Sequence, residues 1–167
     1  MDADEEQDDS ETAQFAATEE IFDDGSENAL AVGGGEITDD VWTPLENESS
    51  ISFKYDESNK TLYFKCSGTA EMPSNNQSGS TAQWALALKN KTKEVEKVVI
   101  GEGITKIGQN NFDNTYSDWP NLKEVDLAST VTTIGNASFC DVAALQTINL
   151  NDVEKIEQGG LAGTGIE

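Results

Sequence analysis

Among the side chains of this sequence that could do chemistry are many carboxylates and two thiols, but the chain contains no histidine. Histidine is the commonest general base and a member of the usual nucleophilic triads, so reactions of that kind are disfavoured. Paired carboxylates can support glycoside hydrolysis, but Glu124 and Asp126 alternate with apolar residues in a predicted strand, where a solvated surface is expected. Motifs that cradle phosphates or dinucleotides between a strand and a helix are also absent from the sequence. We therefore predict that the protein is not an enzyme and has no catalytic residues and no cofactor.

Metal binding has little support in the sequence. The stretches DDSE (8–11) and TEEIFDDGSE (18–27) could attract Ca²⁺ loosely, but they lack the ligand spacing of an EF-hand loop. Two cysteines without any histidine cannot complete a zinc site. Cys66 and Cys140 are predicted to be buried free thiols, and a disulfide between them is the alternative in an exported protein. We predict no metal site.

Negative charge is concentrated in the N-terminal third of the chain. Residues 1–50 contain 17 of the 32 acidic side chains and none of the 10 lysines, and the whole chain has a net charge of −22. The negative electrostatic potential of such a chain repels phosphate backbones and anionic lipids, so we expect no nucleic-acid partner. Residues 1–50 are predicted to be a disordered acidic tether, because they bury too little apolar surface to offset the cost of ordering. Within them, VWTPL (41–45) could dock as a short strand, and Trp42 is expected to touch the folded part.

The sequence also bears on where the protein works. No apolar run reaches the roughly 20 residues of a membrane helix, so we expect no membrane insertion. The chain does not begin with a cationic segment and an apolar core, as a secretory signal peptide does. Its acidic start instead suits a segment that follows a removed signal, and our hypothesis is that the protein is exported.

Residues 51–94 precede a repeated region and have a pattern of their own. ISFKY and TLYFKC alternate apolar and polar residues on either side of the polar stretch DESNK, which predicts a β-hairpin over 51–66. A loop rich in Ser and Asn follows, with Pro73 near its start. The next segment, AQWALALKNKTKEVE, carries Trp84 and indicates a short helix.

An internal repeat governs residues 95–167. VVIGEGITKIGQNNF (98–112) returns as VDLASTVTTIGNASF (125–139) and, more weakly, as INLNDVEKIEQGGL (148–161). A period of about 20–29 residues with apolar positions in register is typical of a stacked solenoid, in which each unit covers the apolar face of its neighbour. We predict about two and a half units, the last truncated at the C-terminus. Glu157 stands where the first two units have Gly108 and Gly135, which predicts a distorted turn.

These residues resemble leucine-rich repeats of the BspA-like type, which occur in exported and surface proteins of bacteria and some protists. The resemblance covers about 51–167 and is carried by VEKVVIGEGITKIGQNNF, LKEVDLASTVTTIGNASF and LQTINLNDVEKIEQGGL. TLYFKCSGTAEM, followed by Trp84, resembles the cap before the first repeat. Thr115 and Val142 depart from the family, which often has cysteine at those places. The resemblance implies a β-rich α/β fold: a right-handed leucine-rich-repeat solenoid with an N-terminal β-hairpin cap at 51–94.

The resemblance also implies a function. It suggests a non-catalytic module, secreted or at the cell surface, that binds a protein or a glycan in adhesion or recognition. Two other hypotheses stay open: a structural spacer that displays a downstream domain, and an accessory segment of a secreted carbohydrate-degrading enzyme or complex. The last unit ends with an apolar edge, so the alternative to a truncated repeat array is a dimer through this open end.

The candidate binding residues are those that the repeat strands direct away from the core. They form two columns, Lys97, Glu124, Thr147 and Val99, Asp126, Asn149. The second extended pieces add an outward row of Thr105, Lys106, Thr132, Thr133, Glu154 and Lys155. A four-residue insertion between the first two units contributes Tyr116 and Trp119. Either these aromatics are exposed and contact a ligand, or Trp119 packs over Phe112 in the core.

Overall fold

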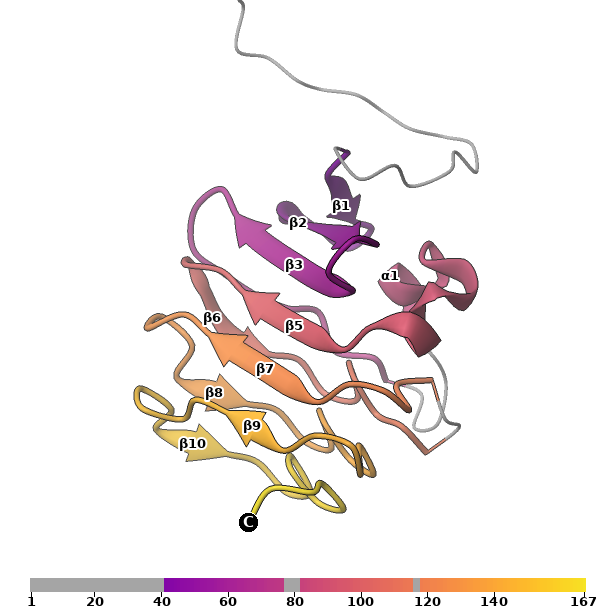
Figure 1. Cartoon of the computed structure of the whole chain (residues 1–167). Helices are drawn as coiled ribbons and strands as arrows, with labels where there is room; N and C mark the ends of the chain where they lie inside the picture. The colour runs from indigo at the N-terminus through magenta and orange to yellow at the C-terminus, as the bar shows by residue number, and fades with distance from the viewer. Residues whose placement is uncertain (1–40, 77–81, 116–117) are drawn as a thin grey trace, which may run out of the picture. The chain divides into compact units, whose positions relative to one another are not determined.

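The computed structural model describes residues 41–76, 82–115 and 118–167. These residues form two β-sheets, in strand orders β1-β2-β3-β5-β7-β9 and β10-β8-β6-β4 (Figure 1). The first sheet contains β1 (Thr43–Leu45), β2 (Glu48–Asp56), β3 (Thr61–Cys66), β5 (Lys97–Ile100), β7 (Glu124–Leu127) and β9 (Thr147–Ile148). The second contains β4 (Ala70–Glu71), β6 (Ile104–Ile107), β8 (Thr133–Ile134) and β10 (Lys155–Ile156). A short helix, α1 (Gln83–Leu86), and a 3-10 helix, η1 (Lys89–Glu94), lie between β4 and β5, so the strand-rich α/β class predicted from the sequence is confirmed.

The hairpin predicted over 51–66 is present. β2 and β3 pair in antiparallel fashion, from Ile51 with Cys66 to Asp56 with Thr61. β1 pairs with β2 on the other side, and the Lys65 ammonium lies 4.3 Å from the centroid of the Trp42 ring, so Trp42 contacts the hairpin as expected. Residue 50, where the predicted tether ends, lies inside β2, because the alternating pattern continues back to Glu48, and residues 43–45 form β1. The rest of the expected tether, 1–40, lies outside the described residues.

Each repeat contributes one strand to each sheet. In the six-stranded sheet β5, β7 and β9 pair in parallel, with Val98 beside Val125 and Val125 beside Ile148. In the four-stranded sheet β6, β8 and β10 pair in parallel, with Ile107 beside Ile134 and Ile134 beside Ile156. Figure 1 shows the strands of successive repeats lying side by side in both sheets. The apolar positions that recur in the sequence are therefore neighbours in space.

The hairpin and the repeats share one apolar core. Val98, Val125 and Ile134 are each at most 1% exposed and belong to a single cluster that also holds hairpin residues. Aromatic rings run through this cluster from the hairpin onward: the Phe64 ring lies 6.0 Å from that of Phe112, edge to face. The Phe112 ring then stacks on that of Phe139 with 5.0 Å between centroids and 3° between planes. The predicted common interior of the stacked units is confirmed.

Tight turns bring the backbones of successive repeats into close contact. The amide of Gly135 donates to the carbonyl of Ile107 at 2.9 Å, and a Cβ at residue 135 would lie 2.5 Å from that oxygen. Glu157, the equivalent residue of the last unit, donates from its amide to Ile134 at 2.8 Å. The distortion predicted for that turn is therefore not seen in its inter-repeat hydrogen bond.

We expect Gly135→Ala to destabilise the fold by about 1–3 kcal/mol, because the new methyl group would meet a backbone oxygen that cannot move without breaking an inter-repeat hydrogen bond. The matched control is Gly68→Ala, since a Cβ at Gly68 meets no atom within 4 Å. Urea unfolding of the two variants and the parent chain measures both effects. Equal stabilities of the two alanine variants would contradict the close approach at Gly135.

Candidate binding surface

The six-stranded sheet presents a continuous polar face opposite to the core. In β5 and β7 buried residues alternate with more exposed ones, which directs Lys97 and Val99, and Glu124 and Asp126, away from the core. Because the pairing is in register, Lys97 lies beside Glu124 and Glu124 beside Thr147. We call the side of the six-stranded sheet that faces away from the core the outer face. Lys97, Glu124 and Thr147 form its first row. The row was predicted from the sequence, and the pairing confirms that its members are neighbours.

A second row of the outer face crosses from the hairpin into the repeats. Asp126 lies beside Val99, Val99 beside Tyr63 and Tyr63 beside Lys54. The sequence analysis missed Tyr63 and Lys54 because it treated the hairpin as a separate cap. In the structure β3 pairs in parallel with β5, so the hairpin extends the sheet. The alternation in TLYFKC, which places Tyr63 opposite Leu62 and Phe64, was the available signal.

The two rows differ in how far their charges are already paired. In the first row the Lys97 ammonium donates to the Glu124 carboxylate at 2.7 Å. This hydrogen bond raises the pKa of Lys97 above its usual value. In the second row neither Lys54 nor Asp126 makes a hydrogen bond or an ion pair within the described residues. The second row thus holds a lysine and a carboxylate that lack a directly bonded partner, with Tyr63 and Val99 between them, although Lys54 interacts electrostatically with Asp56 and Asp126 with Lys97.

Asn149 and Trp119, two of the candidate binding residues, make contacts within the fold. The Asn149 side chain donates to the Leu127 carbonyl at 2.8 Å and accepts from the Leu127 amide at 2.6 Å, so it continues the sheet where β9 has ended. Trp119 is 1% exposed, and its ring lies 5.2 Å from that of Phe112. The prediction of an exposed Trp119 is wrong, and the alternative of core packing over Phe112 is confirmed. Tyr116 lies outside the described residues.

The outward row of the four-stranded sheet is more fully paired. Lys106, Thr133 and Lys155 lie beside one another in the predicted order. The Glu157 carboxylate accepts from both lysines at 3.1 Å, and these bonds, with Lys106 first, lower the pKa of Glu157. It also accepts from the Asn136 amide at 3.1 Å. We therefore take the outer face of the six-stranded sheet as the candidate binding surface.

A ladder of alternating charges borders the outer face where its strands begin. Lys60, Glu96 and Lys123 immediately precede β3, β5 and β7, and backbone bonds place each beside the next. The Glu96 carboxylate accepts from Lys123 at 2.8 Å and from Lys60 at 2.7 Å. These two hydrogen bonds, with Lys123 first, lower the pKa of Glu96 from 4.5 to about 2. Glu96 thus links the hairpin to the first two repeats.

Within the described ranges no three His, Cys, Asp or Glu side chains gather closely enough to hold a metal ion. Nor is any helix of these ranges long and apolar enough to cross a membrane. Cys66 and Cys140 are free thiols as predicted, but both are half-buried where the sequence predicted buried thiols. Cys66 ends β3 at the margin of the core, which explains its partial exposure.

The repeats of this chain are similar to known leucine-rich repeats. Residues 85–167 match the family model of the BspA type leucine rich repeat region (6 copies). The crystal structure of a leucine-rich repeat protein from Eubacterium ventriosum matches with a TM-score of 0.57 and 27% identity, over 70% of this chain and 28% of that one. The crystal structure of a leucine rich cell surface protein from Faecalibacterium prausnitzii matches with a TM-score of 0.33 and 15% identity, over 71% of this chain and 46% of that one. This chain thus spans less than half of either protein, and comparison with curated proteins gives no match.

We predict that Glu96→Gln lowers stability at neutral pH and that its effect disappears in acid. Because the folded-state pKa of Glu96 lies below 4.5, its pairing stabilises the fold above about pH 4.5 and ceases to do so as the pH falls through about 2. Thermal unfolding of both proteins between pH 7 and pH 2 should therefore give Tm curves that converge on acidification. A Tm difference that stays constant over this range would contradict the assignment.

Proposed function

Because residues 85–167 belong to the BspA-type leucine-rich repeat family, we propose that this chain is a non-catalytic module that binds another protein through its outer face. The in-register parallel pairing in both sheets supports a right-handed solenoid, which presents a rigid surface assembled from equivalent positions of successive units. The hairpin, joined to β5 in the same sheet, acts as the N-terminal cap of this solenoid.

The observation that carries the proposal is the second row of the outer face. Protein interfaces concentrate their binding energy in a few residues near the centre, with Tyr enriched, and surround them with polar groups. Tyr63 and Val99 are half-buried neighbours and supply such a centre. Lys54 and Asp126 flank them with unpaired charges of opposite sign, which a complementary partner can satisfy.

We place this module outside the cell, either secreted or at the cell surface, where it serves adhesion or recognition. Leucine-rich repeats of the BspA-like type occur in exported and surface proteins, which supports this location. A surface location gives a protein-binding face access to partners from other cells or from the surroundings.

We expect Tyr63→Ala to weaken binding to a partner by about 2 kcal/mol, as for a central interface residue. Asp126→Lys should also weaken it, because the charge at one flank is reversed. The measurement is binding of the full chain and its variants to an array of purified extracellular proteins, with affinities of the positives determined by calorimetry.

Thr133→Ala is the matched control, since Thr133 lies on the outward row of the four-stranded sheet. It should bind as the parent chain does, and circular dichroism should show all variants folded. If the array shows no binding, the spacer hypothesis is favoured. If Tyr63→Ala binds the partner as tightly as Thr133→Ala and the parent chain do, the partner uses another surface and the proposal is wrong.

A further inference from the structure

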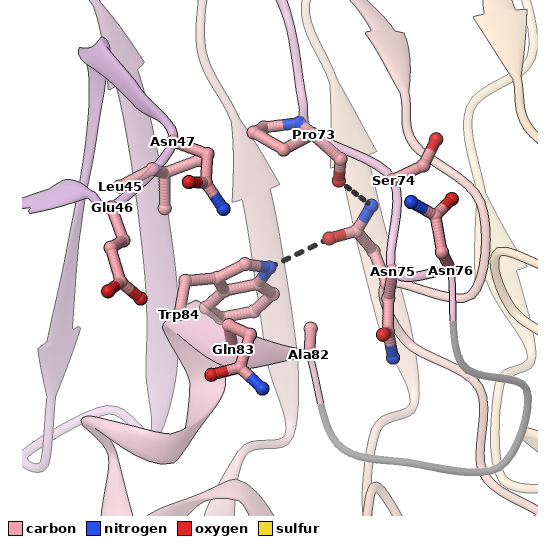
Figure 2. A pocket seen from close by; sticks show the side chains of 11 residues that line it. Leu45, Glu46, Asn47, Pro73, Ser74, Asn75, Asn76, Ala82, Gln83 and Trp84 are labelled. Carbon is pink, nitrogen blue, oxygen red and sulfur yellow. Dashed lines mark hydrogen bonds between the residues drawn. The ribbon is translucent and has the colours of Figure 1, made fainter.

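A cavity of about 220 Å³ lies between the hairpin and the first repeat. It is lined by the turn from β1 to β2, by residues 73–76 after β4, by the beginning of α1 and by one residue of the first repeat. Figure 2 shows Trp84 between the side chains of Glu46 and Asn47 on one side and the segment 73–76 on the other. The cavity shares no residue with the outer face.

Hydrogen bonds to the first repeat hold the floor and one wall of this cavity. The Trp84 indole N–H donates to the Asn111 side-chain oxygen at 2.7 Å, and the Asn111 amide donates to the Pro73 carbonyl at 2.9 Å (Figure 2). Farther along the wall, the Asn75 backbone amide donates to the Gln109 carbonyl at 2.8 Å. Asn111 is 1% exposed, so the two hydrogen bonds of its side chain are shielded from water. A ligand would thus enter a site that is already formed, which lowers the entropic cost of binding.

Four polar side chains at the cavity are not engaged with the rest of the protein. Glu46, Asn47, Asn76 and Gln83 all line it, and none makes a hydrogen bond or ion pair within the described residues. Each amide offers two donors and one acceptor, and the carboxylate offers acceptors only. These four exposed side chains therefore offer hydrogen-bonding groups of both kinds around the buried Trp84.

The charge and size of the cavity restrict its ligand. Its lining contains one carboxylate, Glu46, and no lysine, so an anionic ligand would be repelled. Its volume is smaller than the roughly 300–1,000 Å³ of pockets for drug-sized ligands, so it suits a single ring. Sugar hydroxyls both donate and accept, which matches amides beside a carboxylate.

We propose that this cavity binds one neutral sugar residue, held by the side chains of Glu46, Asn47 and Gln83 above the edge of Trp84. The proposal is independent of protein binding at the outer face. A ligand of this size with ordinary binding energy per atom has an affinity in the millimolar range. Such a site serves best for glycans that present many copies of the same sugar, because weak binding is strengthened by multivalency.

The test is a ¹H–¹⁵N NMR titration of the full chain with D-glucose, D-galactose, D-mannose and N-acetyl-D-glucosamine. At least one of these sugars should shift the assigned Trp84 indole signal with saturation in the millimolar range. Gln83→Ala and Asn47→Ala should each weaken that binding about threefold to tenfold, the effect of losing one hydrogen bond. D-Glucuronate, which carries a carboxylate on the same ring as glucose, should bind more weakly than D-glucose, and Glu46→Gln should reduce this difference.

The matched control is Gln146→Ala, which removes an exposed side-chain amide outside the cavity and should leave the titration unchanged. Backbone spectra of all variants verify that the fold is retained. The proposal is overturned if none of the four sugars shifts the Trp84 signal at up to about 100 mM, a range that covers weak single-ring binding. It is also overturned if Gln83→Ala and Asn47→Ala bind as the parent does, or if the shifts fall on the outer face instead.

Discussion

The packing of one repeat against the next is the constraint on which the rest of the structure depends. No single unit has enough apolar surface to form its own core, since each consists of two short strands and a return. The stack of Phe112 on Phe139 and the burial of Ile134 between neighbouring units show how the interior is shared. The same core continues into the hairpin through Phe64, so the hairpin and the repeats are stabilised together.

This constraint also determines the surfaces. Because buried side chains must coincide from one unit to the next, the strands pair in register, and this pairing alone aligns the outward residues in rows. Most charges in these rows are satisfied within the protein, as with Glu157 between two lysines. Among the described residues, Lys54 and Asp126 on the outer face and Glu46 at the cavity are charged groups without a hydrogen-bond or ion-pair partner, so a partner can satisfy them.

The recurring apolar positions of the sequence were sufficient to predict the repeat strands, the shared core and the first row of the outer face. They were not sufficient to place Tyr63 on the outer face. Alternation assigns a residue to one side of a strand without showing which strand will be its neighbour. Trp119 lies in an insertion with no counterpart in the other units, so periodicity could not show that its ring packs on Phe112. The cavity escaped prediction for a similar reason: Glu46, Trp84 and Asn111 are far apart in the chain and meet only in the fold.

The central claim is that successive repeats are energetically coupled through one interior. A double-mutant cycle on Phe112→Leu and Phe139→Leu, measured by urea unfolding of the full chain, tests it most directly. The stacked rings predict a coupling free energy of about 0.5–1.5 kcal/mol, as for aromatic pairs in direct contact. Single-variant effects that add with no coupling would show that the two units pack independently, which would contradict the shared core.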